Sequence, residues 1–317
     1  MATSQPRIMP RRGASGAWSR LKSPATDPLQ AYGLPSKGET RLNDLKAQEN
    51  YYNKIVERYM KFCGASGGGA ELDTLFASLT LSSQTTSILP TSRSTSDPKI
   101  PTALPPLPTT KTTDQTTNIP SSELSLIISS MRKLREAIVS TRRTDTFAQR
   151  SYIFLIRACI LTFHWEGYHP ALLYLLYTIH PITPLPTHEL NEFANYQILD
   201  LACRQQDLPN AYITKLAFGI TDRRVNAVLK ALATDNWTLF WRVRKRVDGY
   251  QRAVMRFAEE GLRLHALKCL GSAYFTAERV YVERCAGSTW EELGRLGVGW
   301  ELIEDGAGVV IKRVKKR

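Results

Sequence analysis

Hydrophobic residues recur every three to four positions over most of the second half of the chain, which is the spacing of amphipathic helices. No strand-like alternation interrupts this pattern, and glycine- or proline-containing segments separate the helices. The predicted helices are Glu123–Val139, Thr146–His164, His169–Ile179, His188–Gln205, Pro209–Phe218, Asp222–Ala233, Asn236–Val247, Gly249–Glu260 and Leu262–Tyr274. Residues 123–274 are therefore predicted to form an all-α helical repeat of stacked helical hairpins.

Two aspartates stand where helices of this repeat are predicted to begin. Asp207 precedes Pro209, and Asp222 precedes the next apolar run. An aspartate at a helix start accepts a hydrogen bond from a free backbone amide, so both are predicted N-caps.

Residues 275–317 have a different pattern, which predicts a winged-helix module with a basic tail. Two short helices, Ala277–Cys285 and Thr289–Leu296, come first, and Ser288 or Thr289 is expected to cap the second. The β-branched runs Val298–Ile303 and Val309–Val314 follow, joined by a turn-rich link typical of a β-hairpin.

Before the repeat, three segments differ in composition. Residues 1–40 lack an apolar core and are expected to be a disordered basic tail. Residues 41–79 contain short helical segments, Arg41–Phe62 and Glu71–Leu79. From Thr80 to Ser122, 27 of 43 residues are Ser, Thr or Pro, which predicts a disordered linker.

The apolar face of the helix Arg41–Phe62 leaves two interpretations open. Tyr52, Ile55 and Tyr59 lie on this face. They either pack back on the main body or bind a partner, because residue spacing cannot separate a core face from a docking face.

Charge is concentrated at the two ends of the chain. The net charge is +13; residues 1–40 hold six basic and two acidic residues, and residues 242–317 hold sixteen and ten. Basic surfaces attract polyanions, whereas solvated helix faces and tails are also commonly basic. The candidate nucleic-acid-binding residues are Arg242, Arg244, Lys245, Arg246, Arg252, Lys312, Arg313, Lys315, Lys316 and Arg317. They form one surface only if the two groups are adjacent in space.

Cysteine usage and hydropathy bear on the compartment. Five cysteines without a CxxC pair are typical of reduced thiols in a cytoplasmic or nuclear protein. A mitochondrial leader is a minor alternative for the acid-free basic N-terminus. No apolar run is long enough to span a bilayer, so no membrane association is expected.

The order of a helical repeat followed by a winged helix resembles the PCI-domain family. The resemblance rests on the segments Asn236–Arg242, Leu262–Leu267, Ala273–Tyr274, Trp290–Leu293 and Gly299–Trp300. It is nearest to the small-subunit group of the signalosome, the proteasome lid and translation initiation factor three, and is also similar to the Sac/GANP-type export proteins. The resemblance covers about residues 123–317. It implies assembly with other PCI or MPN subunits through the winged helix and, in the export branch, binding to RNA or DNA.

Within this resemblance, several residues are expected to be structural. They are Trp237, Phe240, Trp241, Arg263, Leu267, Tyr274, Trp290, Leu293 and Trp300. Aromatic residues at helical spacing are usually buried. Val309, Val310 and Ile311 are expected in an edge strand, which either is guarded by charge or pairs with a partner.

Signals for catalysis are weak. Gly64–Gly68 fits the G-x-S-x-G pattern around Ser66 but follows a helix, not a strand. His265 has only Cys269 at helical spacing, which is too few ligands for a metal site. No cofactor is expected. The sequence therefore predicts a non-enzymatic scaffold or adaptor subunit, with a nucleic-acid-binding PCI protein as the alternative and a serine hydrolase as a remote one.

Overall fold

The computed structural model describes residues 27–65, 119–303 and 306–312. The protein is mostly helical, with a small antiparallel sheet near the C-terminus. The helices are α1 (Leu45–Ala65), α3 (Ile119–Ser140), α4 (Thr146–Leu161), α5 (Trp165–Tyr174) with the π-helical continuation η4 (Leu175–Ile179), α6 (Thr187–Cys203), α7 (Leu208–Ala217), α8 (Arg223–Ala233), α9 (Trp237–Arg244), α10 (Gly249–Ala273), α11 (Arg279–Ala286) and α12 (Trp290–Arg295). The strands are β1 (Thr276–Glu278), β2 (Glu301–Leu302) and β3 (Gly308–Val310).

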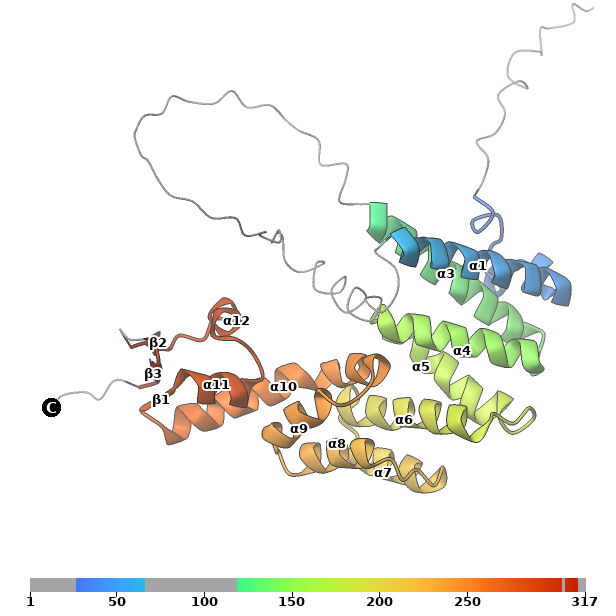
Figure 1. Ribbon diagram of the computed structural model, residues 1–317. Coiled ribbons are helices and arrows are strands. Elements are labelled where there is room, and N and C mark those ends of the chain that lie inside the picture. Colours follow the sequence, from blue (N-terminus) through green and yellow to red (C-terminus); the bar gives the residue numbers. More distant parts are fainter. Residues whose placement is uncertain (1–26, 66–118, 304–305, 313–317) are drawn as a thin grey trace, which may run out of the picture.

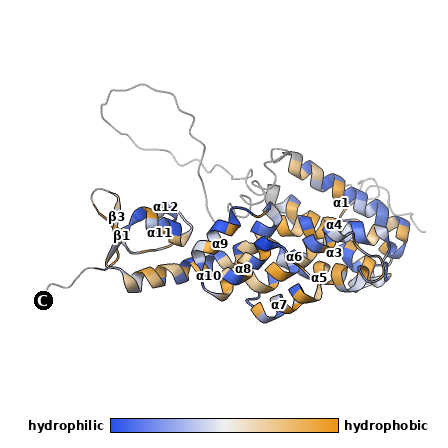
Figure 2. Ribbon diagram, turned by 60° about the horizontal axis from the view of Figure 1, so that its bottom comes forward, coloured by the Kyte–Doolittle hydropathy of each residue, from blue (hydrophilic) through white to orange (hydrophobic). Residues whose placement is uncertain are grey.

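Helices adjacent in sequence pack on one another to form an elongated stack (Figure 1). Helices α1 and α3 lie at one end, and α11, α12 and the strands lie at the other. We call residues 274–303 and 306–312 the C-terminal module. Hydrophobic and hydrophilic positions alternate around the helices of the stack (Figure 2), as expected for helices that bury one face each.

The first helix packs back on the stack. Tyr52 and Tyr59 are 9% exposed and Ile55 is fully buried, in the same core as α3 and α4. Both tyrosine rings contact Phe154 edge-on. The partner-binding interpretation of Tyr52, Ile55 and Tyr59 is therefore wrong, because this helix buries its apolar face in the protein's own core.

A buried arginine fixes α1 to the corner between α3 and α4. The Arg143 side chain is 8% exposed and donates to Glu49 Oε1 at 2.6 Å, to both carboxylate oxygens of Asp145, and to the Leu45 carbonyl at 3.1 Å. A buried guanidinium is stable only when its donors are satisfied in this way. Docking of α1 is thus specified by polar contacts as well as by apolar ones.

Part of the predicted N-terminal tail is also ordered against the stack. Leu29 is 2% exposed, and its carbonyl accepts hydrogen bonds from the Tyr51 hydroxyl and the Lys133 ammonium. Residues 27–40 are therefore not the disordered tail predicted for residues 1–40. Residues 1–26 and the predicted helix at residues 71–79 lie outside the described residues.

Several helix boundaries differ from the prediction, and two of the differences change the architecture. Helix α3 begins at Ile119, so the last four residues assigned to the linker are helical. Helix α10 is continuous where two helices were predicted, because Val254, Leu262, Ala266 and Leu270 form one buried stripe through Gly261. A glycine inside a helix costs only about 1 kcal/mol, which this burial offsets. The predicted caps Asp207, Asp222 and Thr289 are confirmed.

The sheet has three strands in the order β1-β3-β2, and all pairs are antiparallel. Val309 pairs with Ala277 on one side and with Leu302 on the other, and its side chain is fully buried. The prediction of an edge strand at Val309, Val310 and Ile311 is therefore wrong. The short segment that precedes α11 supplies a strand missed from the sequence, and β1 and β2 form the edges.

No helix in the described ranges is long and apolar enough to cross a lipid bilayer.

Candidate functional site

The C-terminal module is joined to the stack through tryptophan side chains. Trp241 is 7% exposed, and its indole nitrogen donates to the Cys285 carbonyl at 2.9 Å. Gly287 adopts φ +63°, and a Cβ there would stand 2.5 Å from the Trp241 ring. Arg263 Nε donates to the Ala286 carbonyl at 3.2 Å. Helices α9, α10 and α11 are therefore locked together at this joint.

Most residues expected to be structural lie in or against the core. Phe240 and Leu293 are fully buried. Trp237 packs against both the main core and the smaller core of the C-terminal module, and Leu267, Trp290 and Trp300 pack against the smaller one. Tyr274 differs, because it is 43% exposed and contacts Tyr281 edge-on. It belongs to the surface more than to the core.

Exposed apolar residues flank the edge strand β1 in the sequence. Tyr274 and Phe275 immediately precede β1 and are 43% and 60% exposed; Val280, in the first turn of α11, is 69% exposed. We call these three residues the β1 patch. Strand β1 pairs only with β3 among the described strands. An unpaired strand edge beside exposed apolar groups is a common site for protein docking.

Some of the basic residues of α9 and of the start of α10 are already engaged in contacts within the protein. The Arg244 guanidinium pairs with Glu259, and Arg252 donates to the carbonyls of Arg244 and Val247. Arg242, Lys245 and Arg246 are exposed, with no carboxylate partner within the described part of the chain. We call these last three residues the α9 cations.

Lys312, the one described member of the C-terminal basic group, does not lie beside the α9 cations. Lys312 Nζ donates to the Ser272 carbonyl at the far end of α10, twenty residues after Arg252. At 1.5 Å per residue, these positions are about 30 Å apart along the helix axis. Lys312 therefore does not extend the α9 cations into one surface. Arg313, Lys315, Lys316 and Arg317 lie outside the described residues.

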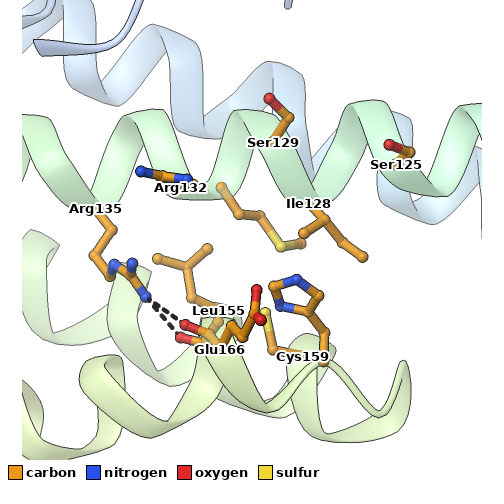
Figure 3. Close-up of a pocket in the computed structure, with 11 residues that line it drawn as sticks. Ser125, Ile128, Ser129, Arg132, Arg135, Leu155, Cys159 and Glu166 are labelled. Carbon is orange, nitrogen blue, oxygen red and sulfur yellow. Dashed lines mark hydrogen bonds between the residues drawn. The ribbon is translucent and has the colours of Figure 1, made fainter. Parts of the chain in front are cut away.

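A polar cavity of about 350 Å³ lies between α3, α4 and the start of α5 (Figure 3). Its volume falls in the range of small-molecule sites. Its apolar lining is Ile128, Met131, Leu155 and Cys159, and its polar lining is Ser125, Ser129, Arg132, Arg135, His164 and Glu166, with Gly167 at the base. Sequence reasoning missed this site. The signal that could have found it is the row of serines and arginines at positions 125, 129, 132 and 135, which share one face of a helix.

The Cys159 thiol in this cavity is poorly suited to act as a nucleophile. Burial raises the pKa of the Cys159 thiol to about 12, and the nearby Arg135 charge offsets this only in part. A thiol with such a pKa carries almost no thiolate at neutral pH. Gly167 is required here, because a Cβ would stand 2.6 Å from His164 Nδ1 and 2.7 Å from Cys159 Sγ. The cavity is therefore suited to binding more than to nucleophilic chemistry.

The most extensive buried polar network centres on Asp200 in α6, which the sequence analysis did not single out. Asp200 is fully buried and accepts from Tyr168 Oη at 2.6 Å, from Arg204 Nε and a terminal nitrogen at 2.7 Å each, and from Gln205 Nε2 at 2.8 Å. His169 Nδ1 lies 3.2 Å from its carboxylate. Burial opposes the charged form, but these hydrogen bonds outweigh it and hold the pKa of Asp200 below its usual value.

The described residues add no support to a metal site at His265 or to a serine nucleophile at Ser66. His265 contacts Cys269 Sγ at 3.6 Å, and no cluster of three metal-ligating side chains occurs in the ranges that the structure describes. Ser66 lies outside them, so the hydrolase alternative stays a prediction.

Neither a protein-family model, a curated protein nor a solved structure matches this chain.

Proposed function

We propose that the protein is a non-enzymatic scaffold or adaptor subunit of a multiprotein complex, built on the PCI plan, and that it docks through its C-terminal module. The partners would be other PCI or MPN subunits. The observation that carries the proposal is the β1 patch, which places exposed apolar side chains beside an edge strand.

The element order supports the PCI plan. A long helix, a strand, two short helices and two further strands follow one another from α10 to β3. This order is typical of a winged helix, and it follows helices that pack as successive neighbours, as in a helical repeat.

The physical argument for docking is that the β1 patch is costly to leave in water. Burying a large aliphatic or aromatic side chain contributes about 1.5–3 kcal/mol, so three such residues can supply a substantial interface core. A partner strand added to β1 would satisfy its unpaired backbone groups and fix the register.

The second candidate function is binding to RNA or DNA, and the α9 cations favour it. Arg242, Lys245 and Arg246 carry charge that no described carboxylate neutralises. Cations of this kind contact phosphates without reading sequence, and their contribution falls steeply as salt rises.

Affinity capture of the full chain at low and high salt separates the two functions. A scaffold should retain the same protein partners at about 0.5 M salt, because burial of apolar surface is little screened. A nucleic-acid binder should lose its ligand there, and Lys245→Glu with Arg246→Glu should flatten the salt dependence. Absence of any salt-resistant protein partner would contradict the scaffold proposal.

A further inference from the structure

Arg135 differs from the other arginines that join helices of the stack. Arg143, Arg157 and Arg204 each face a carboxylate at hydrogen-bond distance. Arg135 instead donates to the Gly167 carbonyl at 2.8 Å and to the Glu166 carbonyl at 3.5 Å, and no carboxylate of the described chain lies within ion-pair distance. A half-buried guanidinium held only by carbonyls keeps its full charge, which an anion would stabilise.

Arg135 is held at the first turn of α5, mainly by its 2.8 Å hydrogen bond to the Gly167 carbonyl. Pro170 lies inside α5 and has no amide to donate to the carbonyl of Glu166, four residues earlier. Arg135 reaches this first turn from α3, and its side chain lines the cavity (Figure 3). The charge is therefore held in place before any ligand arrives, which reduces the cost of binding.

The other polar groups of the cavity add to the same preference. Arg132 lies one turn before Arg135 and uses its Nε for Glu136 at 2.9 Å, while Glu136 also accepts from Ser36. The terminal nitrogens of Arg132 have no partner among the residues that the structure describes. His164 contributes an imidazole, and the hydroxyls of Ser125 and Ser129 line the same wall. Glu166 is the one acid of the lining and is not paired with Arg135.

We infer that this cavity binds a phosphate monoester. Arg135 has no carboxylate partner among the described residues, and the terminal nitrogens of Arg132 remain available beside its ion pair with Glu136, so both planar groups can donate to phosphate oxygens. The apolar lining of Met131, Leu155 and Ile128 can contact the carbon atoms of an ester, which inorganic phosphate lacks. The ester is supplied either by a small metabolite or by a phosphorylated side chain, and both present the same chemistry. The helices that line the cavity, α3, α4 and α5, lie away from the C-terminal module (Figure 1), so the site is independent of the docking role.

Isothermal titration of the full chain with O-phosphoserine, a short phosphoserine peptide and inorganic phosphate tests the inference. The titration is run at about 0.15 M salt to screen non-specific attraction to the basic protein. One ester should bind saturably at one site, and more tightly than inorganic phosphate. Binding of the peptide alone assigns the ligand to a phosphorylated protein, and binding of free O-phosphoserine assigns it to a small molecule.

Two variants and a matched control make the test specific. Arg135→Gln removes the central charge, and Ser129→Asp adds a carboxylate at an exposed position without removing a described contact. Each should weaken binding about tenfold or more. Arg223→Gln removes an exposed charge of α8, outside the cavity and outside the α9 cations, and should leave affinity unchanged. Equal loss in Arg223→Gln, no saturable binding, or equally tight binding of succinate would overturn the inference.

Discussion

Replacing Asp200 by asparagine should destabilise the protein far more than its conservative size suggests. The wild-type carboxylate accepts four hydrogen bonds at 2.6–2.8 Å while fully buried. Asparagine keeps one acceptor oxygen and points an NH₂ group at donors. The Arg204 guanidinium, whose side chain is 16% exposed, then loses its counter-ion.

The expected cost is about 3–5 kcal/mol, the range for breaking a buried ion pair by removing one partner. For a body of this size it corresponds to a fall in Tm of roughly 6–20 °C. Urea unfolding followed by circular dichroism measures the loss of unfolding free energy. Asp207→Asn is the matched control, because Asp207 is an exposed helix cap and asparagine caps equally well.

The pH dependence provides a second measurement of the same network. Because the folded-state pKa of Asp200 is lowered, its contribution is fully present above the unfolded pKa of about 4 and is lost as pH falls below that value. The difference in unfolding free energy between the wild type and Asp200→Asn should therefore become smaller below about pH 4. A loss of less than about 1 kcal/mol relative to Asp207→Asn at neutral pH would contradict a stabilising role for the buried Asp200–Arg204 pair.

Two further predictions concern the joints of the fold. Gly287→Ala should cost about 2 kcal/mol or more in urea unfolding, because the new Cβ meets the Trp241 ring at 2.5 Å and φ is positive, whereas Gly294→Ala, in open space, should be neutral or slightly stabilising. Arg143→Ala should speed hydrogen exchange in α1, because the contacts to Glu49 and the Leu45 carbonyl are lost, and unchanged exchange there would contradict the docking of α1.

Helix positions were largely predictable because local periodicity and caps determine them. Asp207, Asp222 and Thr289 cap the helices that the sequence assigned to them. The helix α10 was predicted as two helices, Gly249–Glu260 and Leu262–Tyr274, because the buried stripe that runs through Gly261 becomes visible only in the structure.

Contacts between elements that are far apart in the sequence were harder to predict than the helices themselves. The apolar face containing Ile55 looks the same whether it meets α3 or a partner, and only the structure separates these cases. Strand β1 was missed because three residues carry too little periodicity, and its pairing placed Val309 at the centre of the sheet. The cavity between α3, α4 and α5 depends on Arg135 of α3 reaching the Gly167 carbonyl of α5, and these two residues are far apart in the sequence.

The most direct test of the docking role is affinity capture with a substituted β1 patch. The double variant Phe275→Asp, Val280→Asp is compared with Ile213→Asp, Leu216→Asp, which changes exposed apolar residues of α7. The first variant should weaken capture of salt-resistant protein partners about thirtyfold or more, as expected for hot-spot residues, while the second retains them. Equal retention by both variants, with the fold intact by circular dichroism, would contradict a docking surface at β1.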